Sequence, residues 1–67
     1  MSPKRLGRVI KQLREKKGLS QKALGEKVGV SDAYITMLET GKRKNPSLEI
    51  LKALAKALGV PVAELVG

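Results

Sequence analysis

The segment SQKALGEKVGVSDAYITMLE, residues 20–39, decides the fold of this chain. Ser20 and Ser31 each precede a run with helical periodicity, and serine is a favoured N-cap because its hydroxyl accepts a hydrogen bond from the first turn. Between the two runs stands Gly29, which can adopt the positive φ that ends a helix. We therefore predict two short helices joined by a tight turn within residues 20–40.

The second of these helices has two different faces. Ile35 and Leu38 are its apolar contacts. At about 100° per residue, the opposite side holds Asp32 at the flank, then Ala33, Thr36, Met37 and Thr40, which apart from Met37 are small or polar. A short helix held by a partner across a glycine turn fits the major groove of duplex DNA. We therefore expect double-stranded DNA as the partner and a helix-turn-helix as the motif.

These outward residues also admit a structural interpretation. Asp32 can stabilise its helix as an acidic residue at the positive N-terminal end, and small side chains suit any helix that lies close to a neighbour. Tyr34 is the only aromatic residue and lies nearer the apolar face, where we expect it to pack rather than to stack on a base.

The positive charge of the chain is concentrated in one part of it. The sequence has 14 Lys and Arg residues against 6 Asp and Glu, a net charge of +8. Residues 1–44 contain 12 of the basic residues and 4 of the acidic ones, so this segment alone carries the whole net charge. A solvated lysine-rich surface would explain the number of charges, but the one-sided placement favours a polyanionic partner.

Size and composition limit the remaining possibilities. Sixty-seven residues form one small domain, and the absence of cysteine and histidine excludes disulfides and the usual zinc sites. We expect no metal and no small-molecule cofactor, and the lack of cysteine fits a reducing cytoplasm. No apolar run approaches the roughly 20 residues that cross a bilayer, so we expect no membrane segment.

Further helices flank the central pair. Residues 1–5 are predicted to form a flexible basic arm, followed by a helix from Leu6 to about Lys17. Residues 47–66 are predicted to form C-terminal packing helices, the first with the apolar face Leu48, Leu51, Leu54, Ala55 and Leu58. The last turn holds more valine than it can bury, and we expect Val62 and Val66 to contact a second copy.

The chain resembles the Cro/repressor-type helix-turn-helix family, the xenobiotic-response-element or lambda-repressor-like group, at a series of positions that follow the family's order along the sequence. The matches span Leu6 to Leu65 and include Leu19-Ser20-Gln21, Val28-Gly29-Val30-Ser31, Leu38-Glu39, Pro46-Ser47 and Leu58-Gly59-Val60. The resemblance implies an all-α, compact five-helix bundle. It also implies non-enzymatic, sequence-specific DNA binding by a repressor-like transcriptional regulator, usually as a homodimer.

The resemblance also assigns roles to individual residues. It implies that base edges are contacted by Asp32, Ala33, Thr36 and Met37, and that phosphates are contacted by Gln21, Lys42, Arg43 and Lys44. It pairs Arg14 with Glu39, and both lie at the edge of an apolar stripe, where a buried ion pair can form. No catalytic residue and no metal ligand is implied.

Three positions depart from the family pattern. Gly25 stands where alanine is common, and we expect a close approach of two backbones there. Pro61 replaces the usual capping serine or aspartate. The outward face of the helix that the resemblance implies as the recognition helix, Ser31–Thr40, carries no Arg, Gln or Asn, the side chains that make strong bidentate base contacts.

Other function classes fit the sequence less well. An enzyme is disfavoured because the carboxylates are scattered singly and no serine stands in a nucleophile motif. RNA binding is disfavoured because the chain has no set of aromatic residues on which unpaired bases could stack. Membrane-surface binding is disfavoured because it would need the apolar face of the first helix, which the core also needs. The main alternative is an antitoxin or adaptor module whose role is protein–protein interaction, because a fold alone does not determine function.

Overall fold

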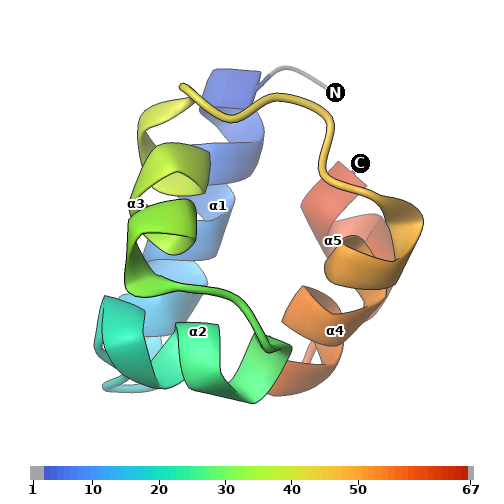
Figure 1. Cartoon of the computed structure of the whole chain (residues 1–67). Helices are drawn as coiled ribbons and strands as arrows, with labels where there is room; N and C mark the ends of the chain where they lie inside the picture. Colours follow the sequence, from blue (N-terminus) through green and yellow to red (C-terminus); the bar gives the residue numbers. More distant parts are fainter. Residues whose placement is uncertain (1–2, 67) are drawn as a thin grey trace.

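In the part of the chain that the structure describes, residues 3–66, the computed structural model has five helices and no strand. They are α1 (Pro3–Lys16), α2 (Gln21–Val28), α3 (Asp32–Thr40), α4 (Leu48–Leu58) and α5 (Val62–Val66). Helix α3 packs against both α1 and α2, while α4 packs against α2 and α5, and α5 closes the ring against α1 (Figure 1). The all-α, five-helix prediction is confirmed.

Serines and glycines set the helix boundaries. The hydroxyls of Ser20, Ser31 and Ser47 accept the N–H of the third residue that follows, at 2.9, 3.0 and 3.2 Å. The helices α2, α3 and α4 each end at a glycine with positive φ: 88° at Gly29, 81° at Gly41 and 72° at Gly59. Each serine thereby satisfies one of the main-chain N–H groups left open at a helix start. Each glycine allows its own N–H to bond a carbonyl oxygen of the last turn.

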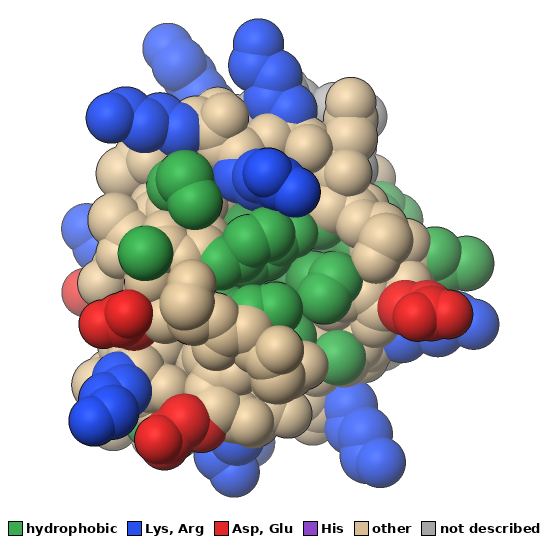
Figure 2. All heavy atoms as spheres, in the orientation of Figure 1, with side chains coloured by type: hydrophobic (Ala, Val, Ile, Leu, Met, Phe, Trp, Pro, Cys, Tyr) green, Lys and Arg blue, Asp and Glu red, His purple; other side chains and the backbone are tan. Residues whose placement is uncertain are grey.

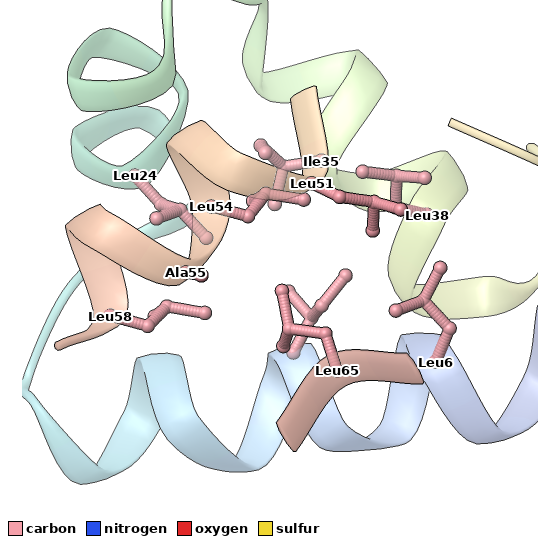
Figure 3. Packing of buried hydrophobic residues seen from close by; sticks show 10 residues of the cluster. Leu6, Leu24, Ile35, Leu38, Leu51, Leu54, Ala55, Leu58 and Leu65 are labelled. Atoms are coloured by element: carbon pink, nitrogen blue, oxygen red, sulfur yellow. The ribbon is translucent and has the colours of Figure 1, made fainter. Parts of the chain in front are cut away.

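One hydrophobic core holds the helices together (Figure 3). Every helix contributes to it, and its ten buried members are Leu6, Ile10, Leu24, Ile35, Leu38, Leu51, Leu54, Ala55, Leu58 and Leu65. No polar or charged residue of the described chain is buried to the same degree. Burial of these apolar side chains is the main source of stability in so small a domain.

Two predictions about individual segments differ from the structure. Helix α1 begins at Pro3, so residues 3–5 are helical and the predicted arm is wrong there, while Met1 and Ser2 lie outside the described residues. Proline suits the first turn of a helix, where its missing N–H leaves no bond unmade. Leu48, predicted on the apolar face of α4, is 59% exposed because it occupies the first position of that helix.

Candidate nucleic-acid interface

The outward face of α3 is open to solvent. Ile35 and Leu38 are 0% and 1% exposed, whereas the four predicted base-contacting residues are all exposed: Asp32, Ala33, Thr36 and Met37. The predicted division of this helix into a buried and an outward face is therefore confirmed. Its contact with bases stays a prediction.

The turn between α2 and α3 is held tightly against α2. The N–H groups of Gly29 and Val30 both donate to the carbonyl oxygen of Gly25, at 2.7 and 2.9 Å. A Cβ added to Gly25 would lie 2.7 Å from the carbonyl oxygen of Val30, so a side chain does not fit there. The predicted close approach of two backbones is confirmed, and the second backbone is that of the turn at Val30 and Ser31.

An ion pair joins α1 to α3. Arg14 Nε lies 2.6 Å from Glu39 Oε2 and Nη2 lies 3.2 Å from Oε1, while Nη1 donates to the carbonyl oxygen of Leu19 at 2.7 Å. The side chains are 11% and 4% exposed, so water screens the pair weakly. The hydrogen bond to Glu39 raises the pKa of Arg14, although burial opposes this shift. The predicted pair is confirmed.

Gln21, the first residue of α2, is built into the same network. Its Nε2 donates to Glu39 Oε1 at 3.0 Å, and its Oε1 accepts from the Thr36 hydroxyl at 2.8 Å. The amide thus links the ion pair to the outward face of α3. Gln21 remains half-buried at the start of α2, next to that face, and its predicted phosphate contact stays a prediction.

The loop after α3 presents three exposed cations, Lys42, Arg43 and Lys44. The Arg43 N–H donates to the Met37 carbonyl oxygen at 3.0 Å, and its guanidinium carbon lies 5.2 Å from the centroid of the Tyr34 ring. That distance is typical of a cation–π contact. In Figure 2, Lys and Arg side chains gather along the upper edge, over the region where Figure 1 places the start of α1 and this loop.

Apolar side chains also remain exposed at the other end of the chain. Val62 packs partly against the core, while Val66 is 37% exposed. Leu48 is the most exposed large apolar residue of the described chain, although its place in the helical periodicity predicts a position on the core face. The start of α4 and α5 lie on the same side of the molecule, at the right in Figure 1.

Residues 3–66 contain neither a cluster of metal-ligating side chains nor a helix suited to span a membrane. Within this range, His, Cys, Asp and Glu nowhere gather in groups of three or more that could hold an ion. None of the helices in the same range has the length and apolar character needed to span a bilayer.

Comparison with known proteins gives the family. The family model described as "Helix-turn-helix" matches residues 10–65, which is most of the chain. The chain belongs to the helix-turn-helix family. This assignment confirms the resemblance found in the sequence and fits the geometry of α2, the Gly29 turn and α3.

Three proteins illustrate the similarity within the family. The HTH-type transcriptional regulator SinR of Bacillus subtilis is 38% identical over 60 residues, which cover 90% of this chain and 54% of SinR. A crystal structure of SinR in complex with DNA superposes with a TM-score of 0.87, at 37% identity over 92% of this chain and 98% of that one.

Two other structures are similarly close. The restriction-modification controller protein C.AhdI of Aeromonas hydrophila has a TM-score of 0.88, at 36% identity over 94% of both chains. The P22 c2 repressor in complex with a synthetic operator has a TM-score of 0.84, at 38% identity over 90% of this chain and 89% of that one. The present chain spans about half the length of full regulators such as SinR (54%).

Proposed function

We propose that this domain binds double-stranded DNA sequence-specifically and acts as a repressor-like regulator of transcription, without a catalytic step. The observation that carries this proposal is the exposed outward face of α3 directly beside three exposed cations, Lys42, Arg43 and Lys44. A helix that enters a major groove needs such a face, and the flanking phosphates need cations next to it. Such a regulator would work in the cytoplasm.

Each part of the interface has its own role in this proposal. Asp32, Ala33, Thr36 and Met37 contact base edges and select the sequence. Gln21 and the loop cations contact phosphates, which fixes the position of the domain on the duplex but carries no sequence information. The solved complexes of SinR with DNA and of the P22 repressor with an operator support DNA binding by similarity.

We infer that the DNA-bound form is a homodimer. Val62 is half-buried and Val66 is 37% exposed, and Leu48 adds further apolar surface at 59% exposure. A two-fold contact through these residues would place two α3 helices in successive turns of the major groove on one side of the duplex, roughly 34 Å apart. The same apolar surface is what an adaptor or antitoxin module would use to bind another protein.

Selection of bound sequences from a random pool of duplex DNA tests the function. The proposal predicts an enriched, palindromic site whose half-sites are separated by about one helical turn. An equal enrichment of all sequences, together with binding that disappears at moderate salt, would reduce the interaction to non-specific charge attraction. That result would favour the protein-interaction alternative.

A further inference from the structure

The hydroxyl group of Thr36 is surrounded by hydrogen-bond acceptors on its protein side. Its Oγ1 lies 2.8 Å from Gln21 Oε1 and 3.1 Å from the main-chain oxygen of Asp32. A threonine hydroxyl has one proton to donate and two lone pairs that accept. Both neighbours can only accept, so the proton of Thr36 must point toward one of them.

The orientation of the Gln21 amide follows from the ion pair behind it. Glu39 accepts hydrogen bonds from Arg14 Nε and Nη2, at 2.6 and 3.2 Å. A carboxylate paired with arginine only accepts, so the amide group of Gln21 that faces it must be the NH₂, at 3.0 Å. The amide oxygen is therefore the atom left for Thr36. Thr36 therefore donates to Gln21 and Gln21 donates to Glu39, which also accepts from Arg14 on its other side.

The other polar side chains on this face have the same character. The Thr40 hydroxyl lies 3.0 Å from the main-chain oxygen of Thr36 and 3.3 Å from that of Met37, which again take its proton. Asp32 is a carboxylate and accepts the N–H of Ala33 at 2.9 Å. The outward face of α3 thus presents oxygen lone pairs and apolar groups, and neither of its hydroxyl protons is free.

We propose that Thr36 is a specificity-determining acceptor that takes a hydrogen bond from an exocyclic amino group, adenine N6 or cytosine N4. This inference rests on the proposed function. In the major groove these two amino groups are the donors that the bases offer, whereas guanine O6 and N7 and thymine O4 only accept. A hydroxyl whose proton points toward the Gln21 amide oxygen or the main-chain oxygen of Asp32 discriminates against guanine and thymine at the base it faces.

Base analogues in the selected duplex test the direction of this bond. Each adenine is replaced in turn by purine, which lacks the N6 amino group, and each cytosine by 2-pyrimidinone, which lacks N4. At one position per half-site, we expect the parent protein to lose affinity on the order of tenfold. The isosteric variant Thr36→Val should show no such loss of affinity at that position. Thr36→Ser, which keeps the hydroxyl, should show the loss again.

The controls separate a hydrogen bond from an apolar contact. Uracil in place of thymine removes only the methyl group, and we expect no Thr36-dependent loss from it. Circular dichroism of Thr36→Val should show the helical content of the parent, because the side chain is exposed. The inference would be overturned if uracil or 7-deazaguanine caused a loss of affinity that depends on Thr36. It would also be overturned if removal of the amino group lowered the affinity of the parent and of Thr36→Val equally. A parent protein that selects no site at all would contradict the proposed function as well.

Discussion

Gly7 of α1 lies directly against the main chain of Glu39 in α3. A Cβ added to Gly7 would fall 2.5 Å from the carbonyl oxygen of Glu39 and 2.8 Å from its carbonyl carbon, and it would also meet the carbonyl oxygen of Leu38. All three are backbone atoms, which cannot rotate away as the end of a side chain could. The absence of a side chain at Gly7 therefore allows α1 to approach α3 closely enough for Arg14 to reach Glu39.

Replacing this glycine should destabilise the domain. Alanine is the better helix former by about 1 kcal/mol, but here its methyl group would force α1 away from α3. We expect Gly7→Ala to lower the free energy of unfolding by about 1–3 kcal/mol, the usual cost of overpacking. Chemical denaturation measures this change.

The matched control is Gln12→Ala on the exposed side of the same helix. This substitution also introduces alanine, but at an exposed position, and it should change the free energy of unfolding by less than about 0.5 kcal/mol. If Gly7→Ala were as stable as this control, the close packing of α1 on α3 would be wrong.

The Arg14–Glu39 pair should be important for stability. Because the Glu39 side chain is only 4% exposed, Arg14→Ala would leave its carboxylate poorly solvated. Removing one partner of a buried pair costs about 3–5 kcal/mol, and we expect either Arg14→Ala or Glu39→Ala to approach that range. Thermal unfolding measures it, with Lys11→Ala, an exposed cation of α1, as the control for lost charge. A negligible shift of the midpoint in both pair variants would show that the pair contributes little.

The loop cations should set affinity without choosing the sequence. Changing Lys42, Arg43 and Lys44 together to glutamine should flatten the slope of log affinity against log salt by up to about 0.9 per lost phosphate contact in each subunit. The selected site should stay the same, because phosphates carry no base identity.

A control with the same change in net charge replaces three exposed lysines on α1 and α4, Lys11, Lys52 and Lys56. Its salt slope should stay close to that of the parent. Equal slopes in the loop variant and the parent would place the phosphate contacts elsewhere on the domain.

Two copies should bind one duplex site. Sedimentation with a single-site duplex should give two protein chains per DNA at saturation. The uncharged change Val66→Asn should weaken binding of the second copy on the order of tenfold, as loss of an interface contact does, while Gln12→Asn on α1 should not. One chain per site at saturation would contradict the homodimer.

The local chemistry of single residues made much of the fold predictable. Ser20, Ser31 and Ser47 cap helices and Gly29 ends one, because the preferences of these residues are expressed within one turn of backbone. Arg14 and Glu39 were predictable as a pair from the resemblance and from their places beside apolar stripes. Pro3 also carried a signal, a proline at a helix start, which the prediction of a flexible arm overlooked.

Other features depend on how distant segments meet. The contact of Gly7 with α3 and the contact of Arg43 with the Tyr34 ring join residues whose sequence spacing indicates no contact. Leu48 shares the periodicity of the core but lies where the helix begins, beyond the packed part of α4. The bond between Gln21 and Thr36 needs both side chains in fixed rotamers, which only the packed structure specifies.

If the outward face of α3 selects the DNA sequence, a substitution of Ala33 should change the selected site. Ala33 is exposed and faces away from Ile35 and Leu38, so Ala33→Gln should leave the fold intact and add a side chain that prefers adenine. Parallel selections from random duplex DNA with the parent and with Ala33→Gln measure the effect. We expect two consensus sites that differ at one position per half-site. An identical consensus from a folded Ala33→Gln protein, or a variant that unfolds, would contradict it.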